Sequence, residues 1–349
     1  MNTPSPTQGS RRMSAAQLAR MLGVSAAAVS YALHGQPGVS DETRKRILAA
    51  AKQYDVRPTK PRNTTSDTAV LGVILADVSN PFYSEFAISV TDVAREQGHE
   101  VFLSHTRDEN RAVTAAVTTM IHHRVDGVLL TAIQSGDGEV CRMLRAARIP
   151  FVQISRRMEY AEADFVGIDD RAAGLQIVGH LLEHGYRKFA IVGGPVSSTA
   201  SATRAAGFRE ALSAAEIRLP RKWNITGGLN VPDGVNAARY LLELGELPEA
   251  VICGTDAIAL GLISELRSKG IRVPRDLAVT GFDGLTVTRA HMIDLTTIIQ
   301  PRRQMAQTAV DLVTIRLKQP NGPPQSILCR HGLYIGTSCG CSRKKGEQE

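Results

Sequence analysis

The sequence predicts an α/β protein in which a three-helix head, built around a helix-turn-helix, precedes two lobes of doubly wound parallel sheet. From residue 69 onward buried strands alternate with helices, which is the pattern of such sheets. A helical hairpin pattern lies near the N-terminus, where the positive charge also gathers. Residues 1–68 hold ten Lys/Arg and four Asp/Glu, a net +6 of the total +7 of the 349-residue chain. A small basic module on a nearly neutral body is typical of nucleic-acid binding.

Residues 14–35 predict two short helices joined by a tight turn. Ser14 and Gln17 have the spacing of a capping box, which satisfies free backbone N–H groups at a helix start. Gly23 suits the positive φ that ends a helix, and Ser25 is placed to cap the next one. In a helix-turn-helix the second helix enters the major groove of DNA, so this hairpin is our candidate DNA-binding element. An ordinary helical hairpin packed on its own domain is the alternative.

The second of these helices is expected to bury one face and to turn small side chains outward. The buried positions are Ala28, Val29, Ala32 and Leu33, and the outward positions are Ala26, Ala27, Ser30 and Tyr31. Small side chains allow close approach to base edges, and Ala can touch a thymine methyl. We therefore expect little hydrogen-bonded base readout, with shape and apolar contact carrying more of the recognition.

A third helix is predicted to begin after Ser40, whose side chain can cap it. Its core-facing residues are expected to be Ile47, Leu48, Ala51 and Tyr54. The remaining basic side chains, Arg44, Lys45, Arg46 and Lys52, are then available to DNA phosphates. A solvated helix face has the same composition, so this assignment rests on the helical hairpin beside it.

Residues 56–68 predict a linker, because Pro58 and Pro61 oppose a helix and the Thr, Ser and Asn that follow favour turns. The N-terminal residues are polar and are not followed by the apolar run of a signal peptide. No stretch is long and apolar enough to span a membrane. We therefore expect a cytoplasmic protein.

Five cysteines are scattered along the chain. Cys141 and Cys253 fall within apolar segments, where buried thiols are expected. Cys339 and Cys341 form a C-x-C near the C-terminus, with neither a second Cys pair nor a His cluster beside it in the sequence. We therefore expect no metal site and no cofactor.

The body is predicted to contain two α/β halves of similar make. The first half has strands at 70–76, 99–105, 125–131 and 150–155 and helices at 81–97, 109–124 and 138–147. The second half is expected to open with the strand 165–169 and to continue with strands at 189–194, 223–226, 250–254 and 277–283 and helices at 170–184, 200–214, 233–244 and 256–269. Residues 295–299 and the helix after Pro301 should return the chain to the first half. A cleft between carboxyl strand ends is where such sheets bind ligands.

These segments resemble the LacI/GalR family of bacterial regulators. In the head the resemblance is carried by Val24-Ser25, Val29-Ser30, His34-Gly35, Val39 to Arg44 and Arg57-Pro58. In the body it is carried by DVSNPFY (77–83), RVDG (124–127), RAAGF (204–208), TDAIALG (255–261), GFDG (281–284) and LTT (295–297). The match runs in order from about residue 13 to 335, which is far more specific than one motif.

The resemblance implies a repressor whose affinity for a pseudo-palindromic double-stranded operator is controlled by a small molecule, a sugar or an anionic sugar derivative. It also implies a homodimer with a periplasmic-binding-protein-like core. We expect a head at 1–57, a linker at 58–68, a core at 69–335 and a tail at 336–349. Within the core, lobe 1 is expected at about 69–160 plus 296–325 and lobe 2 at about 161–295 plus 326–335.

The residues implied to contact DNA are Ser14, Ser25, Ala26, Ala27, Ser30, Tyr31, His34, Arg57, Lys60 and Arg62. After the Arg-Pro pair, the family usually has a hinge helix that inserts a Leu into the minor groove. Residues 58–65 hold no Leu, so we expect Lys60 and Arg62 to form a basic strap on the DNA backbone or in a narrow minor groove. A short linker helix formed on DNA is the alternative.

The residues implied to bind the effector are Phe82, Tyr83, Arg156, Arg204, Thr255 and Asp283. Thr255 stands where Asn is usual, and Ser155-Arg156-Arg157 stands where the family has an Asp-Arg pair. One carboxylate lost beside several arginines favours an anionic ligand, such as a sugar acid or a sugar phosphate. Equally, Arg156 or Arg157 can face solvent or a dimer partner, and Phe82 can be core packing.

An α/β enzyme acting on a small sugar-like substrate, with an accessory DNA-binding head, is the competing hypothesis. The Gly-rich runs 193–195 and 227–228 follow strands but match neither G-x-G-x-x-G nor a P-loop. His105, His122 and His123 have no matched nucleophile or ligand spacing. We therefore expect no catalytic residues. A periplasmic sugar-binding protein is excluded by the basic head and the missing signal peptide.

Overall fold

The computed structural model describes residues 13, 15–33, 37–54, 56, 68–158 and 160–342, of which Ala15, Ala16 and Ala26 are described by their backbone alone. The chain divides into two compact units, Met1–Asp67 and Thr68–Glu349. Of the residues predicted to contact DNA, Ser14, His34, Arg57, Lys60 and Arg62 lie outside the described residues, and so does the linker from residue 57 to residue 67.

The first unit is a three-helix head. Its helices are α1 (Ala15–Leu22), α2 (Ala26–Leu33) and α3 (Asp41–Gln53). Leu18, Val29 and Ile47, one from each helix, are fully buried and form the centre of its core. The predicted turn chemistry is confirmed, because Gly23 has φ +64° and the Ser25 Oγ accepts a hydrogen bond from the Ala28 N–H at 3.1 Å.

Two residues expected in the core of the head are exposed instead. Leu48 and Tyr54 are 44% and 36% exposed. Leu48 lies about 100° around the helix from Ile47, at the margin of the buried stripe. Tyr54 follows the last residue of α3, and Val56, which is 7% exposed, takes the place in the core.

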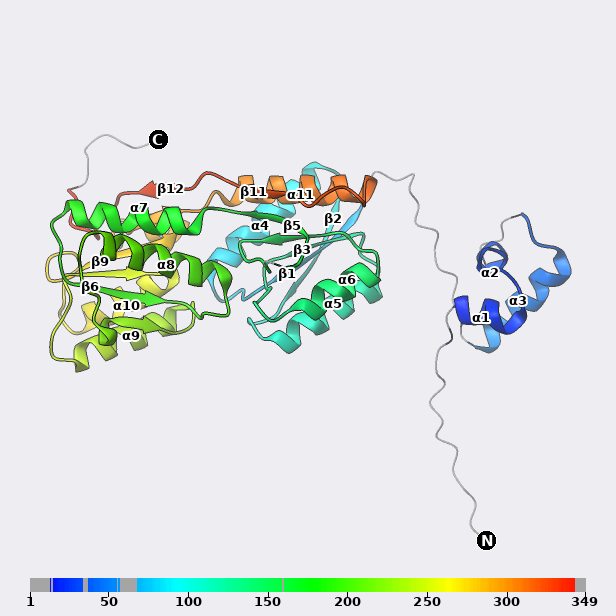
Figure 1. Ribbon diagram of the computed structural model, residues 1–349, viewed down its shortest axis with the longest axis horizontal. Helices are drawn as coiled ribbons and strands as arrows, with labels where there is room; N and C mark the ends of the chain where they lie inside the picture. Colours follow the sequence, from blue (N-terminus) through cyan, green and yellow to red (C-terminus); the bar gives the residue numbers. More distant parts are fainter. Residues whose placement is uncertain are drawn as a thin grey trace, which may run out of the picture. The chain divides into compact units, whose positions relative to one another are not determined.

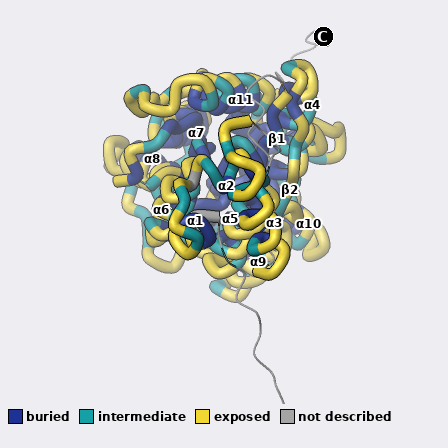
Figure 2. The backbone as a smooth tube through the Cα atoms, turned by 90° about the vertical axis from the view of Figure 1, so that its right-hand side faces the viewer, coloured by how far each residue is buried: buried dark blue, intermediate teal, exposed yellow. Residues whose placement is uncertain are grey.

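The first lobe of the second unit is a six-stranded parallel sheet with the order β11-β5-β4-β3-β1-β2. Its strands are β1 (Val70–Leu75), β2 (Glu100–His105), β3 (Gly127–Leu130), β4 (Phe151–Ile154), β5 (Asp164–Gly167) and β11 (Ser326–Leu328). Its helices are α4 (Pro81–Glu96), α5 (Asn110–His123), α6 (Gly138–Ala146) and α11 (Arg302–Lys318). Strand β1 is almost continuously buried (Figure 2). Strands β3 and β4 are buried throughout, as the apolar runs predicted.

The second lobe has a six-stranded sheet with the order β12-β10-β9-β8-β6-β7, parallel except for β12 (Figure 1). Its strands are β6 (Phe189–Gly193), β7 (Asn224–Thr226), β8 (Ala250–Cys253), β9 (Ala278–Asp283), β10 (Thr296–Ile299) and β12 (Gly332–Tyr334). Its helices are α7 (Asp170–Glu183), α8 (Thr199–Ala214), α9 (Val231–Glu243) and α10 (Asp256–Ser268), with short 3-10 turns η1 (Arg221–Trp223) and η2 (Thr286–Arg289).

Three strands belong to the sheet opposite to the one predicted. Strand β5, expected to open the second lobe, and β11 both pair within the first sheet, whereas β10 pairs with β9 in the second. The chain therefore passes between the lobes three times, after β5, after β10 and after β11. The buried ion pair from Arg316 on α11 to Asp164 on β5, with Nε–Oδ2 at 2.6 Å, fastens the returning helix to the first sheet.

Among the helices of the described ranges, none combines the length and apolar character needed to cross a membrane. Cys141 and Cys253 are buried, as predicted. In both sheets the carboxyl ends of the parallel strands point toward the space between the lobes, so the loops that follow them line one cleft.

Candidate functional site

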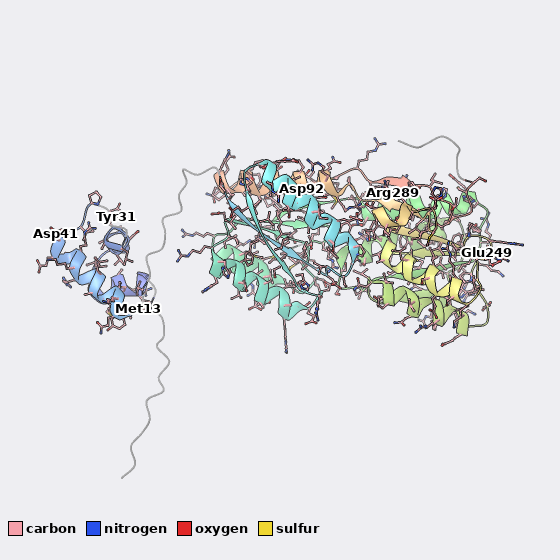
Figure 3. The ribbon with its side chains drawn as sticks, turned by 180° about the vertical axis from the view of Figure 1, so that it is seen from behind. Met13, Tyr31, Asp41, Asp92, Glu249 and Arg289 are labelled. Atoms are coloured by element: carbon pink, nitrogen blue, oxygen red, sulfur yellow. The ribbon has the colours of Figure 1, made fainter. Side chains whose placement is uncertain are left out.

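The head presents the outer face of α2 as its candidate DNA-contacting surface. Ala27 and Tyr31 are exposed on it, Tyr31 at 41%, while Ser30 is half-buried (Figure 3). Gly38 leaves room for the tyrosine ring, because a Cβ at this position would lie only 3.3 Å from the ring carbon Cδ2. The outer face therefore presents small side chains and one exposed aromatic ring.

The basic side chains of α3 flank this element. Lys45, Arg46 and Lys52 are exposed, and Arg44 is half-buried. The helix begins where Ser40 accepts a hydrogen bond from the Thr43 N–H at 3.4 Å. These exposed cations give the head the positive surface that phosphate contacts require.

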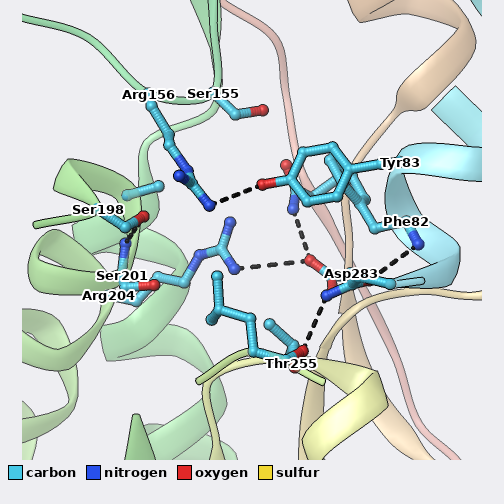
Figure 4. Close-up of a pocket in the computed structure, with 13 residues that line it drawn as sticks. Phe82, Tyr83, Ser155, Arg156, Ser198, Ser201, Arg204, Thr255 and Asp283 are labelled. Carbon is cyan, nitrogen blue, oxygen red and sulfur yellow. Dashed lines mark hydrogen bonds and ion pairs between the residues drawn. The ribbon is translucent and has the colours of Figure 1, made fainter. Parts of the chain in front are cut away.

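The second unit brings all six residues predicted to bind an effector into one pocket between the lobes. Each follows the carboxyl end of a parallel strand or begins the helix after it, apart from Arg204, which lies inside α8. The lining residues include Phe82, Tyr83, Arg156, Arg204, Thr255 and Asp283 (Figure 4).

Arg156 forms the first-lobe wall and is only 2% exposed. Its guanidinium makes a bidentate pair with Asp108, with Nη1–Oδ1 at 2.5 Å and Nη2–Oδ2 at 2.9 Å. Nη2 also donates to the Tyr83 hydroxyl at 3.0 Å. Burial raises the pKa of Tyr83, so this hydroxyl keeps its proton and can itself donate.

Arg204 forms the second-lobe wall and is equally enclosed. Its Nε donates to Asp170 at 2.7 Å, and its Nη1 donates to the Gly254 carbonyl at 3.0 Å and lies 3.5 Å from Asp283 Oδ1. The guanidinium also lies over the Phe282 ring, 3.9 Å from its centroid. Figure 4 shows the two arginine side chains extending into the same space.

Asp283 lies at the end of β9 with φ +133°, a conformation that Asp adopts more readily than most residues. Its Oδ1 accepts a hydrogen bond from Gln300 at 2.7 Å, whereas its buried Oδ2 has no hydrogen-bond partner among the described residues. Burial raises the pKa of Asp283 to about 7, against the opposing effect of Arg204. A ligand group that donates a hydrogen bond to Oδ2 would therefore stabilise the ionised carboxylate.

Ser155 supplies a second available polar atom. Its buried Oγ also has no hydrogen-bond partner within the described ranges. Its backbone has a positive φ of +62°. Sequence reasoning named Ser155 only as part of the run before Arg157. A buried polar atom without a partner is costly unless something outside the chain completes it.

Phe82 and Thr255 line the pocket but also have structural duties. The Phe82 ring stacks on Phe86 with centroids 6.2 Å apart, so the packing role considered for it is present. The Thr255 Oγ1 caps α10 by accepting from the Ile258 N–H at 3.1 Å and donates to the Leu229 carbonyl at 3.1 Å. Thr255 thus positions two pocket segments.

The prediction of an anionic ligand rested on unpaired arginines, and the two arginines in the pocket are already paired with carboxylates. Arg156 is neutralised by Asp108, and Arg204 by Asp170 and Asp283. Arg157 is exposed, with its guanidinium over the Phe165 ring. The carboxylate thought to be lost is supplied by other segments, so the pocket carries paired charges and offers no excess positive charge to an anion.

The lobes are in contact across the pocket. Asn80 Nδ2 donates to the Leu229 carbonyl at 2.9 Å, and Asn230 Nδ2 donates to Asp77 at 2.7 Å. The inner cavity has a volume of about 20 Å³, roughly the space for one water molecule. A second cavity of about 320 Å³ adjoins it and shares Asn80, Tyr83 and Leu229. A ligand of sugar size must therefore use this outer cavity or separate the lobes.

Sequence reasoning missed Asp108 and Asp170, the main partners of the two arginines. Both lie three residues beyond the end of a parallel strand, β2 and β5 respectively. Acidic residues at that position were an available signal, because strand ends of one sheet meet at the same edge.

The prediction of no metal site rested on the lack of histidines near Cys339 and Cys341, and the structure contradicts that premise. His180 and His184, distant in sequence, lie beside Cys339 and Cys341, and the four ligand atoms are all within 4.8 Å of one another. The two histidines are four residues apart on a predicted helix, which was the signal available.

Comparison with known proteins gives matches over both units. A family model described as "Periplasmic binding proteins and sugar binding domain of LacI family" matches residues 68–335, and one described as "Bacterial regulatory proteins, lacI family" matches residues 16–59. The chain is 28% identical to the ribose operon repressor of Escherichia coli K12 over 305 residues, covering 87% of this chain and 92% of that protein. It is 28% identical to the transcriptional repressor PurR of Glaesserella parasuis over 309 residues, covering 88% and 91%.

Solved structures show the same architecture. The transcriptional regulator CelR in complex with cellobiose has a TM-score of 0.71 and 28% identity, covering 94% of this chain and 100% of that chain. The Lac repressor dimer bound to operator and the anti-inducer ONPF has a TM-score of 0.71 at 22% identity, covering 94% and 99%, a likeness in fold.

Proposed function

This chain belongs to the LacI family of bacterial regulatory proteins, and from that premise we propose that it acts as a homodimer on a pseudo-palindromic operator under the control of a neutral, polyhydroxylated effector. As a family member it is a transcriptional repressor that binds DNA and responds to a small molecule, and it is not an enzyme. The pocket between the lobes is accordingly a ligand site, and the competing enzyme hypothesis is set aside. From its action on DNA we infer that the protein works in the cytoplasm.

Recognition of DNA is assigned to the outer face of α2. Ala27 and Tyr31 are exposed there, and Ser30 is half-buried. Small side chains allow α2 to lie close to the floor of the major groove. DNA contact stays a prediction for the other residues named from the sequence, which are Ser14, Ser25, Ala26, His34, Arg57, Lys60 and Arg62.

A homodimer follows from the geometry that two helix-turn-helix heads need to read two half-sites about one helical turn apart. Support comes from the edge strand β2, where Phe102 and Leu103 are 36% and 48% exposed. Apolar side chains on an unpaired sheet edge form a surface that a second copy can cover.

The effector's chemistry is inferred from the atoms that the pocket leaves unsatisfied. Asp283 Oδ2 and Ser155 Oγ are buried without partners among the described residues, and both line the pocket. Hydroxyl groups of a sugar can donate to both, whereas an added anion would meet three carboxylates already paired with two arginines. The unpartnered Asp283 oxygen is the observation that carries this proposal. The ribose and cellobiose in the names of two relatives are neutral sugars.

A thermal-shift screen of the full chain tests the effector class. Neutral sugars are expected to raise the melting temperature, and sugar acids or sugar phosphates to give no shift. Ser155→Ala should weaken the best neutral ligand about 2- to 12-fold, the value of one hydrogen bond between neutral groups. Ser268→Ala, at the end of α10 and outside the lining of both cavities, is the matched control. Stabilisation by anionic sugars alone would contradict the proposal.

A further inference from the structure

Two histidines at the end of α7 and two cysteines from the segment after β12 meet at one edge of the second lobe. His180 lies in the last turn of α7, and His184 immediately follows that helix, so their four-residue spacing places both rings on one side. Cys339 and Cys341 come from the segment after β12. The cluster is not part of the pocket or of the head.

The four ligand atoms lie close enough together to share one metal ion. His180 Nε2 lies 3.2 Å from Cys339 Sγ and 3.8 Å from Cys341 Sγ, and His184 Nε2 lies 3.1 Å from Cys341 Sγ. Bond lengths of about 2.0–2.1 Å to His and 2.3 Å to Cys give tetrahedron edges of about 3.3–3.8 Å. All four atoms lie within 4.8 Å of one another, so side-chain adjustments of up to about 1 Å would bring them to the distances of a tetrahedral site.

The backbone that presents the two thiols is held in place. Gly340 has φ +99°, and a Cβ there would lie 2.9 Å from the Tyr186 hydroxyl, so glycine lets the C-x-C turn pass close to the histidines. The Tyr186 hydroxyl donates to the Cys339 carbonyl at 3.0 Å. The Thr296 hydroxyl donates to Cys339 Sγ at 3.0 Å, a hydrogen bond to a ligand atom of the kind that orients metal ligands.

We propose that His180, His184, Cys339 and Cys341 bind one Zn²⁺ ion in a tetrahedral, four-ligand structural site. Two imidazoles and two thiolates are a donor set typical of zinc, and four protein ligands leave no open position for catalysis. Cys339 is buried, whereas His184 is exposed and Cys341 is half-buried, so the ion has a route in from solvent.

The ion would tie the segment after β12 to the end of α7. The same helix begins at Asp170, which holds Arg204 in the pocket. Because binding links segments about 155 residues apart in sequence and requires the folded arrangement, Zn²⁺ should raise the stability of the second lobe.

The test is Zn²⁺ binding by the full chain, reduced and stripped of metal with a chelator, then titrated against a chromogenic chelator. The expected result is one Zn²⁺ per chain and a higher melting temperature. His184→Ala and Cys341→Ser, both toward the surface and tolerant of change, should lower the affinity about 100-fold or more. Substitution with Co²⁺ should give the visible absorption of a tetrahedral thiolate site.

His122→Ala and Cys329→Ser are the matched controls, because one is an exposed histidine and the other a cysteine outside the cluster. Both should keep full Zn²⁺ affinity and the visible Co²⁺ spectrum. The proposal is overturned if the wild-type chain binds no Zn²⁺, or if both cluster variants bind it as tightly as the wild type. A Cys339–Cys341 disulfide that persists under reductant and Zn²⁺ would overturn it as well.

Discussion

Replacing Asp283 by Asn should make the protein more stable above neutral pH while weakening its hold on the effector. Asn is nearly isosteric and tolerates the positive φ of 133° at this position. Its side-chain oxygen can still accept the hydrogen bond from Gln300. The substitution therefore removes the buried negative charge together with its ion pair to Arg204, an interaction that the pKa of Asp283 already includes.

The size of the effect follows from the pKa of Asp283, which burial raises from 3.8 to about 7. A carboxyl whose pKa is raised on folding contributes stability below pH 4 that is lost as the pH rises through 7. At about 1.4 kcal/mol for each pKa unit, ionising Asp283 at pH 8 costs on the order of 4 kcal/mol. Of this, about 2–3 kcal/mol is lost between pH 5 and pH 8.

Urea unfolding at pH 5 and pH 8 measures this difference. The free energy of unfolding of Asp283→Asn, minus that of the wild type, should increase by about 2–3 kcal/mol between the two pH values. Asp276→Asn is the control, because the hydrogen bond from Arg272 lowers the pKa of Asp276 and leaves it ionised at both pH values. Effector affinity should fall about 10- to 150-fold, the value of a hydrogen bond to a charged group. A pH-independent difference, or unchanged effector affinity, would refute this reasoning.

Two further predictions concern the arginine pairs and the basic head. Arg204→Ala leaves Asp170 and Asp283 without their buried partner, so it should cost about 3–5 kcal/mol of stability. It should also abolish the effector response while DNA binding without effector persists. Urea unfolding measures the first effect and gel shifts the second, and a fully stable, responsive variant would contradict both. Lys45→Ala should reduce the slope of log affinity for DNA against log salt by about 1, whereas Lys269→Ala in the second lobe should leave the slope unchanged; equal slopes for both variants would count against phosphate contacts by α3.

Much of the fold could be predicted because strands buried on both faces give continuous apolar runs, as in β1 and β8. The assignment of β5, β10 and β11 to sheets could not, because an apolar run does not identify its neighbours. In β10 the pairing with β9 is fixed by the fold around Asp256, whose carboxylate accepts from Thr297 at 2.5 Å and from the Leu285 N–H at 2.7 Å. Such contacts are not local in sequence.

The candidate pocket was predictable in its members but not in its charge. Arg156 and Arg204 could be placed there from their segments, yet their partner Asp108 comes from the loop after β2 and their partner Asp170 from the start of α7. Side chains separated by 48 and 34 residues pair only once the strand order is known. Likewise, no sequence pattern indicates that the buried Ser155 Oγ has no hydrogen-bond partner among the residues that the structure describes.

The most direct test of the account is fluorescence anisotropy of the full-length protein on its operator duplex, with and without the neutral sugar identified by thermal shift. The account predicts that this sugar changes operator affinity about 5- to 150-fold, the range of typical coupling between two sites, and is recovered unchanged. In the Asp283→Asn variant the same change should require correspondingly more sugar. A sugar that binds the pocket yet leaves operator affinity the same, or that is converted to a product, would contradict it.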